Sequence, residues 1–198
     1  MKTNKLGPGP DPAPSPFEPV SHRLAPTFRL SRYSEMRGRK CKVPTRVILA
    51  SMAALQTEAM RPRADGAVPR AGLGMDCTIT PIRLGGLSTV QTTDSLYPIV
   101  DDPVLQGKIA AASVLSALYA AGVACVDNLL CLLSVSTRLT EAERDVVVPL
   151  ILEGFREAAA EAGTSVSGQA YLIPTASVRV GHLTGYIKIW LSLDYIRY

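Results

Sequence analysis

The sequence predicts a fold that combines β-strands with α-helices, and three patterns support this prediction. Two runs rich in β-branched residues, 77–82 and 87–93, flank a turn that contains two glycines, which is typical of a β-hairpin. Apolar spacing and N-terminal capping signals predict one helix that ends near Gly122 and another that ends near Gly163. Between these helices, the run 127–136 is too apolar for a strand with one solvated face, so it predicts a buried strand.

The part of the chain before the hairpin is less regular. Residues 1–27 are rich in proline and poor in apolar residues, so we expect a disordered leader. The segment Phe28–Leu30 could begin a short strand. Pro44 suits the first turn of a helix, and the apolar spacing after it predicts a helix to about Met60. A linker rich in proline, glycine and arginine follows at 61–70.

The two longer helices carry clear start signals. Asp102 followed by Pro103 indicates an N-cap residue and a proline in the first turn. Thr140 and Glu143 have the spacing of a capping box, in which each side chain bonds the backbone at the other residue. Pro149 lies inside the second helix and predicts a kink or a break there, because proline lacks the N–H that the helix ladder needs.

The end of the chain predicts short strands. Residues 164–167 form one candidate. After Gln169, apolar residues alternate at Val178 and Val180 and again over 187–193, which suggests further strands.

Length and composition place the chain among globular proteins. Its 198 residues, of which 47% are hydrophobic, suffice for one domain with a real core. No long apolar run predicts a membrane helix, and the N-terminus lacks the apolar core of a signal peptide. The 4 cysteines show no CxxC spacing and there are only 2 histidines, which argues against a zinc site. We therefore expect a cytoplasmic protein with reduced thiols and no membrane partner.

The net charge of +4 hides an asymmetry along the chain. Residues 1–70 carry 13 Lys and Arg against 5 Asp and Glu, whereas the remainder carries 8 against 12. A basic arm of this kind can bind phosphate or nucleic acid. The alternative is a solvated tail, which we favour as far as Arg32, so we do not expect a nucleic-acid partner.

Two aspartates are placed symmetrically about the predicted turn. Asp76 and Asp94 lie at equal sequence distance from Gly85, so an antiparallel pair folded about that glycine would bring them face to face on one sheet face. Two facing carboxylates repel each other unless a cation lies between them, and Mg²⁺ carrying phosphate oxygens would meet that need. The alternative is two exposed loop acids on a hairpin that pairs in another register.

Motifs around this hairpin and further along the chain resemble those of the animal selenophosphate synthetases (selenide, water dikinases). The motifs are Gly72-Leu73-Gly74-Met75-Asp76, Pro81-Ile82-Arg83, Gly85-Gly86-Leu87-Ser88, Val90-Gln91-Thr92-Thr93-Asp94, Tyr97-Pro98-Ile99-Val100-Asp101-Asp102-Pro103, Leu132-Leu133-Ser134-Val135-Ser136 and Ala162-Gly163-Thr164-Ser165-Val166. They follow one another between about Phe28 and about Gln169. The resemblance implies the family's α+β, PurM-like N-terminal domain over 28–176, in which helices pack on a mixed sheet. It also implies a divergent strand-like tail over 177–198 and no C-terminal domain.

The resemblance also implies a site and partners. In the family this domain binds ATP with Mg²⁺ and dimerises by joining sheets. Lys42 matches the lysine that contacts ATP, and Asp76 and Asp94 match aspartates that hold the Mg²⁺-nucleotide. The other nucleotide contacts implied are Gly74, Met75, Gly168 and Gln169. A second copy of this chain, or a full-length paralogue, is the implied protein partner.

Several positions depart from the family pattern. Arg39 stands where active members carry Cys or selenocysteine, and it cannot act as a nucleophile because its guanidinium stays protonated. Lys40 replaces a glycine of the same loop. Ala117 replaces an aspartate of the carboxylate cluster and has no ligand oxygen. One glycine is missing at the turn of Gly168 and Gln169, where glycine lets backbone donors approach phosphate.

The resemblance leaves the function open between three hypotheses. The family converts ATP, selenide and water to selenophosphate, AMP and phosphate, and this chain could be a weak or inactive member of that class of phosphotransferase. It could instead be a non-catalytic, nucleotide-binding relative that dimerises with a full-length paralogue and modulates it. A third possibility is a truncated product that hardly folds, because a lost domain leaves apolar surface exposed.

Overall fold

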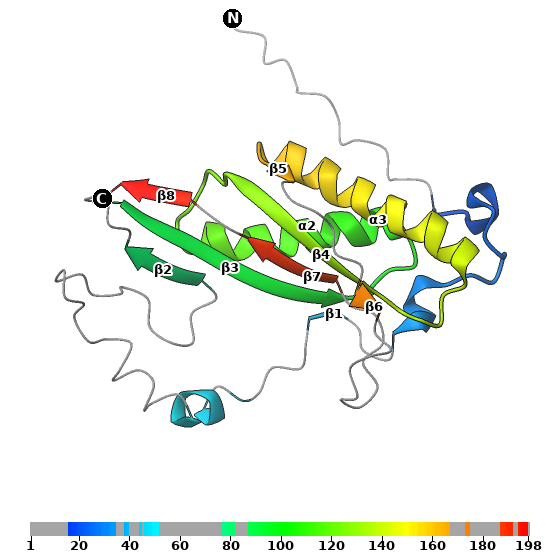
Figure 1. Cartoon of the computed structure of the whole chain (residues 1–198), viewed down its shortest axis with the longest axis horizontal. Helices are drawn as coiled ribbons and strands as arrows, with labels where there is room; N and C mark the ends of the chain where they lie inside the picture. The colour runs from blue at the N-terminus through cyan, green and yellow to red at the C-terminus, as the bar shows by residue number, and fades with distance from the viewer. Residues whose placement is uncertain are drawn as a thin grey trace, which may run out of the picture.

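The structure of the chain is a computed structural model (Figure 1). It describes residues 16–34, 38–39, 44, 46–51, 77–81, 87–166, 173–174, 187–191 and 194–197. For residues 38–39, 81 and those after 166, only the backbone is described.

One sheet forms the centre of the described fold. Its strands are β1 (Gly38–Arg39), β2 (Cys77–Pro81), β3 (Leu87–Tyr97), β4 (Asn128–Val135), β5 (Ser165–Val166), β6 (Ile173–Pro174), β7 (Ile187–Leu191) and β8 (Asp194–Arg197). The main path through the sheet is β1-β3-β7-β4-β5, while β2 and β8 also pair with β3, and β6 pairs with β4 (Figure 1). β4 runs parallel to β5 and β6, and the other pairs are antiparallel. The prediction of a mixed sheet within an α+β fold is confirmed.

The predicted hairpin is present, but its register differs from the one we expected. β2 pairs antiparallel with β3 from Cys77 opposite Thr92 to Pro81 opposite Ser88. These pairs are centred between Leu84 and Gly85, so the register is shifted by one residue from a hairpin folded about Gly85. The hydrophobic pattern explains the shift, because this register places Ile79 opposite Val90 and lets both pack into the core.

The strand predicted at 127–136 corresponds to β4, which lies inside the sheet between β7 and β5. Leu129, Cys131 and Leu133 are no more than 2% exposed and belong to the core, while Leu130 and Leu132 are only half-buried. One face of β4 is therefore fully buried and the other is not.

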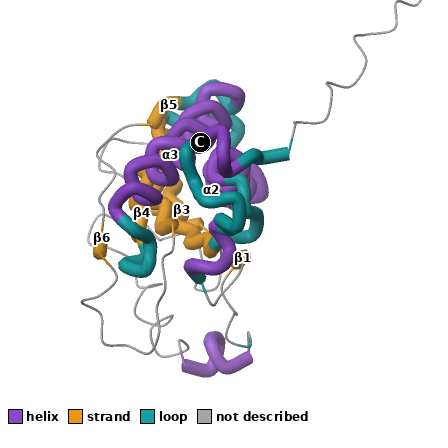
Figure 2. Tube along the Cα trace, turned by 90° about the vertical axis from the view of Figure 1, so that its right-hand side faces the viewer, coloured by secondary structure: helices purple, strands orange, loops and turns teal. Residues whose placement is uncertain are grey.

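Two long helices cover the core face of the sheet. α2 (Pro103–Ala120) packs on β3 and β7 and, along its length, on α3 (Glu141–Glu161). Buried residues of both helices form one core cluster with the buried residues of β3 and β4. In Figure 2, viewed from the side, the two helices lie together next to the strands.

The predicted helix starts are confirmed. The Asp102 carboxylate accepts hydrogen bonds from the backbone N–H of Val104 at 2.8 Å and of Leu105 at 3.1 Å. Thr140 and Glu143 form the reciprocal bonds of a capping box. The predicted break at Pro149 is wrong, since α3 continues through it. Packing against α2 holds the helix together at the point where the proline removes one hydrogen bond.

Two glycines allow α2 and α3 to approach closely. A Cβ atom added at Gly107 would overlap the backbone carbonyl oxygen of Ile151, and one added at Gly154 would overlap that of Val104. Each helix therefore places a bare backbone position against the backbone of the other. This reciprocal contact sets the separation of the two helices over the sheet.

The N-terminal segment differs from the prediction for residues 16–30. Instead of a disordered leader followed by a strand, the structure has two 3₁₀ helices, η1 (Pro19–His22) and η2 (Leu30–Tyr33). Leu24, Phe28 and Leu30 are no more than 6% exposed and join the core. Three buried apolar side chains offset the entropy lost on ordering a proline-rich segment. Residues 1–15 lie outside the described residues.

The remaining predictions are met only in part. Residues 46–51 are helical, as expected, and the rest of that predicted helix lies outside the described residues. The alternation over 187–193 corresponds to β7, which ends at Leu191 and lies between β3 and β4 in the sheet, and β8 follows from Asp194. Residues 178–180 also lie outside the described part. No helix among the described residues is long and apolar enough to cross a membrane.

Candidate nucleotide and metal site

Asp94 lies in the second half of β3 with its carboxylate directed at α2. Oδ2 accepts a hydrogen bond from the Ser113 hydroxyl at 2.7 Å, and Oδ1 accepts one from the backbone N–H of Ser95 at 2.8 Å. The side chain is half-buried between strand and helix. These two bonds hold the carboxylate in one orientation between the strand and the helix.

The first described residue of β2 lies against the same helix. The Cys77 thiol donates to the backbone carbonyl of Ala117 at 3.1 Å. Ala117 follows Ser113 by one helical turn, so both residues lie on the side of α2 that faces the strands. We refer to Asp94, Ser113, Ala117 and Cys77 as the Asp94 site. It is the region where β2, β3 and α2 meet (Figure 1).

β1 brings another predicted position to the same strand. Gly38 pairs with Tyr97 and Arg39 pairs with Leu96, so the backbone of Arg39 lies opposite a residue two places beyond Asp94 on β3. The side chain of Arg39 is not among the described ones. This pairing brings the backbone of Arg39, where the resemblance implies a nucleophile, to the strand of Asp94.

The other predicted site residues cannot be placed. Lys42, Gly74, Met75, Asp76, Gly168 and Gln169 lie outside the described residues. Within the described residues, no group of three His, Cys, Asp or Glu side chains could hold a metal ion. Ala117 accounts for part of this, because its methyl group stands where the resemblance implies a carboxylate. The shifted hairpin register also removes the symmetry argument for the pairing of Asp76 with Asp94.

Ser113 is the residue of the Asp94 site that the sequence analysis missed. A serine inside an apolar helix pattern usually bonds its own helix or faces solvent, so it gave no signal alone. Its position four residues before Ala117 could have indicated that it shares the face of the replaced aspartate.

One buried cysteine of the described residues, Cys131, is not an activated nucleophile. Cys77, Cys125 and Cys131 are free thiols. Burial raises the pKa of Cys131 to about 12, so this thiol stays protonated and unreactive at neutral pH. Cys125 is exposed, and Cys77 donates to Ala117 within the site.

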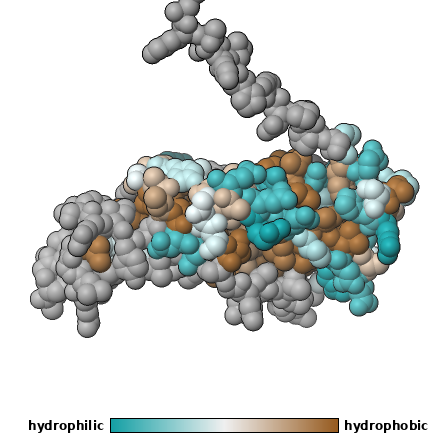
Figure 3. All heavy atoms as spheres, turned by 90° about the horizontal axis from the view of Figure 1, so that it is seen from above, coloured by the Kyte–Doolittle hydropathy of each residue, from teal (hydrophilic) through white to brown (hydrophobic). Residues whose placement is uncertain are grey.

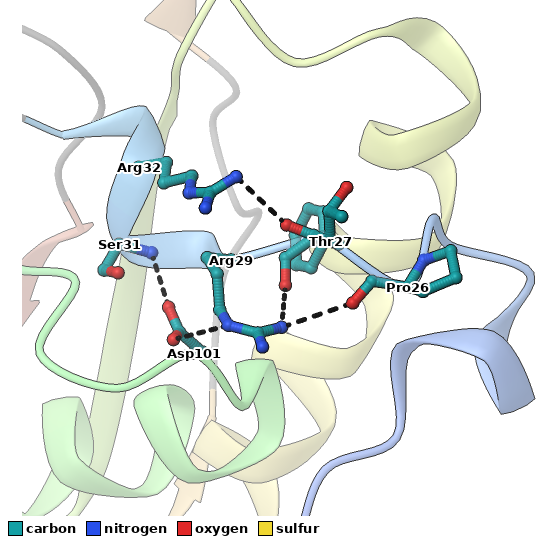
Figure 4. A network of polar contacts seen from close by, with 7 residues as sticks. Pro26, Thr27, Arg29, Ser31, Arg32 and Asp101 are labelled. Atoms are coloured by element: carbon teal, nitrogen blue, oxygen red, sulfur yellow. Dashed lines mark hydrogen bonds and ion pairs between the residues drawn. The ribbon is translucent and has the colours of Figure 1, made fainter.

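The N-terminal segment is tied to the loop that joins β3 to α2. Asp101 accepts a hydrogen bond from the backbone N–H of Ser31 at 3.0 Å and forms an ion pair with Arg29 at 3.7 Å (Figure 4). Arg29 also donates to the carbonyl of Phe28 at 2.6 Å, which fixes the guanidinium beside Asp101. These contacts hold the segment that leads into β1.

A second connection joins this segment to α3. The Tyr33 hydroxyl donates to Glu143 at 2.8 Å, on the carboxylate that also completes the capping box with Thr140. Burial, and then the bond to Glu143, raises the pKa of Tyr33 from 10.0 to about 12. Burial alone would raise the pKa of Glu143, but the bonds from the Thr140 backbone and the Tyr33 hydroxyl outweigh it and lower that pKa.

We expect this connection to appear as a pH dependence of stability. A tyrosine whose pKa is raised on folding stabilises the fold fully below pH 10, and that contribution is lost as the pH rises toward about 12. The variant Tyr33→Phe should therefore have a shallower loss of stability over this range than the wild type. The measurement is urea unfolding between about pH 8 and pH 12, with Tyr119→Phe, at an exposed tyrosine, as control. Equal slopes for all three proteins would contradict it.

The space between η2, β4 and α3 is not a ligand site. Its cavity of about 40 Å³ is lined mainly by apolar side chains, including Leu30, Leu133 and Ile151. A volume of this size holds a water molecule or two and excludes a nucleotide.

The exposed surface over α3, seen from above in Figure 3, mixes hydrophilic and hydrophobic residues.

The fold is PurM-like. The structure is similar to thiamine monophosphate kinase from Aquifex aeolicus, with a TM-score of 0.50 and 15% identity over 76% of this chain and 43% of that chain. It is also similar to the protein tt0281 from Thermus thermophilus, with a TM-score of 0.51 and 18% identity over 79% of this chain and 46% of that chain. At such low identity these likenesses concern the fold alone.

Comparisons of the sequence with curated proteins narrow the class of protein that this chain resembles. No family model matches the chain. Selenide, water dikinase 3 of Danio rerio is 46% identical over 77% of this chain and 38% of its own length. Selenide, water dikinase 2 of Homo sapiens is 43% identical over 77% of this chain and 39% of its own length. A probable selenide, water dikinase of Caenorhabditis elegans is 43% identical over 87% of this chain and 46% of its own length.

Over the matched region, the chain is therefore a homologue of the selenide, water dikinases. It spans less than half the length of these curated relatives. The resemblance found in the sequence motifs is confirmed for that region.

Proposed function

We propose that the chain is a non-catalytic relative of the selenide, water dikinases that binds Mg²⁺-ATP at the Asp94 site. The observation that carries the proposal is the Asp94 carboxylate, held against α2 by the Ser113 hydroxyl at 2.7 Å. This oxygen ligand is half-buried and fixed in orientation, which suits a hard cation that keeps phosphate and water as its other ligands. Asp76, the second proposed ligand by the resemblance, directly precedes Cys77, where β2 begins opposite Thr92 of β3.

The other residues of the proposed site would act on the nucleotide. Mg²⁺ would neutralise the phosphate charge between Asp76 and Asp94. Lys42 would add a cationic contact to the phosphates. Gly74 and Met75 before Asp76, and Gly168 with Gln169, would supply further nucleotide contacts. These roles are the ones that the resemblance implies.

The chemistry of selenophosphate formation is incomplete in this chain. Arg39 at the nucleophile position stays protonated and cannot carry selenium. Ala117 has no ligand oxygen at the position where the resemblance implies a carboxylate. We therefore expect the chain to bind Mg²⁺-ATP without transferring its phosphates, because binding needs fewer groups than phosphoryl transfer does.

Calorimetric titration of Mg²⁺-ATP into the purified chain tests the proposal directly. Saturable binding, and a higher melting temperature with Mg²⁺-ATP, would support it. In parallel, labelled ATP incubated with selenide should give no AMP. Release of AMP would favour the alternative of an active selenide, water dikinase. Broad, non-cooperative melting would instead favour a fragment that hardly folds.

The second part of the proposal concerns a protein partner. The family resemblance implies a dimer formed through the sheet, either of two copies or of one copy with a full-length paralogue. The half-buried Leu130 and Leu132 of β4, which face away from the helices, support such a contact. Light scattering on the chain alone, and after mixing with a full-length paralogue, would distinguish these pairings from a monomer.

Restoring the missing carboxylate should strengthen binding. Ala117 lies partly buried on the side of α2 that faces β2 and β3, so Ala117→Asp would add an oxygen ligand near Asp94. We expect the Kd for Mg²⁺-ATP to fall roughly tenfold, the effect of one added charged contact of about 1.4 kcal/mol. Ala120→Asp, at an exposed position of the same helix, adds the same charge as a control. No change in Kd for Ala117→Asp would place the nucleotide elsewhere.

A further inference from the structure

The contact between Ser113 and Asp94 crosses from helix to strand. The Ser113 hydroxyl donates to Asp94 Oδ2 at 2.7 Å, a well-formed O–H···O hydrogen bond. Ser116, one turn further along α2, shows the more usual behaviour of a helix serine, since its hydroxyl donates to the carbonyl of Ser113 at 2.6 Å. The Ser113 hydroxyl therefore bonds the sheet, whereas the Ser116 hydroxyl bonds its own helix.

The two bonds to Asp94 hold different oxygens. Ser95 belongs to the same strand, so its N–H fixes Oδ1 relative to β3. Ser113 belongs to α2, so its hydroxyl fixes Oδ2 relative to the helix. Together they hold the carboxylate plane in one orientation between the two elements. Without the hydroxyl, Oδ2 would lose the bond that ties it to α2, while Oδ1 would keep its bond to the Ser95 N–H.

We propose that Ser113 is the positioning residue of the site: its hydroxyl holds the Asp94 carboxylate in the orientation that receives the magnesium of Mg²⁺-ATP. This inference rests on the proposed function and adds a specific role for a residue that the family pattern did not single out. Ser113 acts through Asp94, so its effect depends on the metal. Nucleotide without metal does not need the oriented carboxylate.

The test compares three variants by calorimetric titration. Ser113→Ala should weaken Mg²⁺-ATP binding about tenfold, the loss typical of one hydrogen bond to a charged group. Ser113→Thr keeps a hydroxyl and should restore most of the affinity. Ser116→Ala removes a hydroxyl that bonds the Ser113 carbonyl of its own helix, and it should leave the Kd unchanged. Each titration is repeated with ATP in EDTA, where Ser113→Ala should bind as the wild type does.

Each outcome decides the inference. If the wild type binds Mg²⁺-ATP and Ser113→Ala binds it equally well, the positioning role is wrong while the proposed function stands. If Ser113→Ala loses affinity equally with and without Mg²⁺, or if Ser113→Thr does not recover it, Ser113 has a structural role only. If the wild type does not bind Mg²⁺-ATP, the proposed function and this inference both fail. Melting temperatures of all variants show whether the fold is retained.

Discussion

Replacing Gly107 with alanine is expected to destabilise the chain more than any single exposed substitution. The added methyl group would overlap the backbone carbonyl of Ile151, and the backbone N of Phe155 lies only 2.7 Å from its position. These atoms belong to the α3 backbone and cannot rotate away, so the two helices must move apart. The higher helix propensity of alanine adds about 1 kcal/mol to the stability of the fold, but overpacking of this kind costs about 3 kcal/mol. The overpacking therefore outweighs the gain in propensity.

Thermal unfolding measures this effect. A net loss of about 2 kcal/mol corresponds to a fall in Tm of roughly 4–8 °C for a domain of this size. Ala112→Gly, at an exposed position of α2, isolates the propensity term and should cost about 1 kcal/mol without any clash. Gly154→Ala should behave like Gly107→Ala, because it meets the carbonyl of Val104 from the other side. An unchanged or raised Tm for Gly107→Ala would show that the helices can separate at little cost.

Replacing Asp94 with asparagine is expected to abolish the stabilisation by Mg²⁺-ATP. The amide keeps the size of the side chain but removes the charge that the proposed site offers to the cation. Its NH₂ group would also point a donor at either Ser95 N–H or the Ser113 hydroxyl, which donate to the carboxylate at 2.8 and 2.7 Å. We expect the Kd to rise at least about 100-fold, or about 2.7 kcal/mol, which would remove the rise in Tm at ordinary nucleotide concentrations.

The control for this variant is the same aspartate-to-asparagine substitution at an exposed position far along the chain, on α3. Asp145 lies exposed on α3, so Asp145→Asn should leave the nucleotide-dependent rise in Tm intact. A rise that persists in Asp94→Asn would mean that Mg²⁺-ATP binds without this carboxylate, and the proposed site would have to be abandoned. If the melting temperature without nucleotide also falls, titration at a temperature where the variant is folded separates binding from stability.

The local signals in the sequence were sufficient for the hairpin and the two long helices. Asp102 and the pair Thr140 and Glu143 marked where α2 and α3 begin, because a cap depends only on residues within one turn. The runs of β-branched residues marked β2 and β3 for a similar reason. The motif order was enough to indicate the selenide, water dikinases, and the comparisons confirmed that likeness over the matched region.

Other features depended on contacts between distant parts of the chain. The proline-rich segment before Phe28 looked disordered because its few apolar residues have no local partners, yet Leu24 and Phe28 are buried once they meet the core. Pro149 looked like a break because its missing N–H is a local defect, and packing on α2 carries the helix through it. The hairpin register followed from Ile79 packing with Val90, which a count of residues about Gly85 could not reveal.

The sequence by itself determined the secondary structure near each capping and turn signal and the likeness to the selenide, water dikinases over the matched region. Only the tertiary structure decided that Gly107 and Gly154 set the helix contact and that Ser113 reaches Asp94. The physical reason is the range of the interactions. Caps, turns and periodicity act within a few residues, whereas a close backbone approach or a bond from helix to strand exists only when separate elements are packed together.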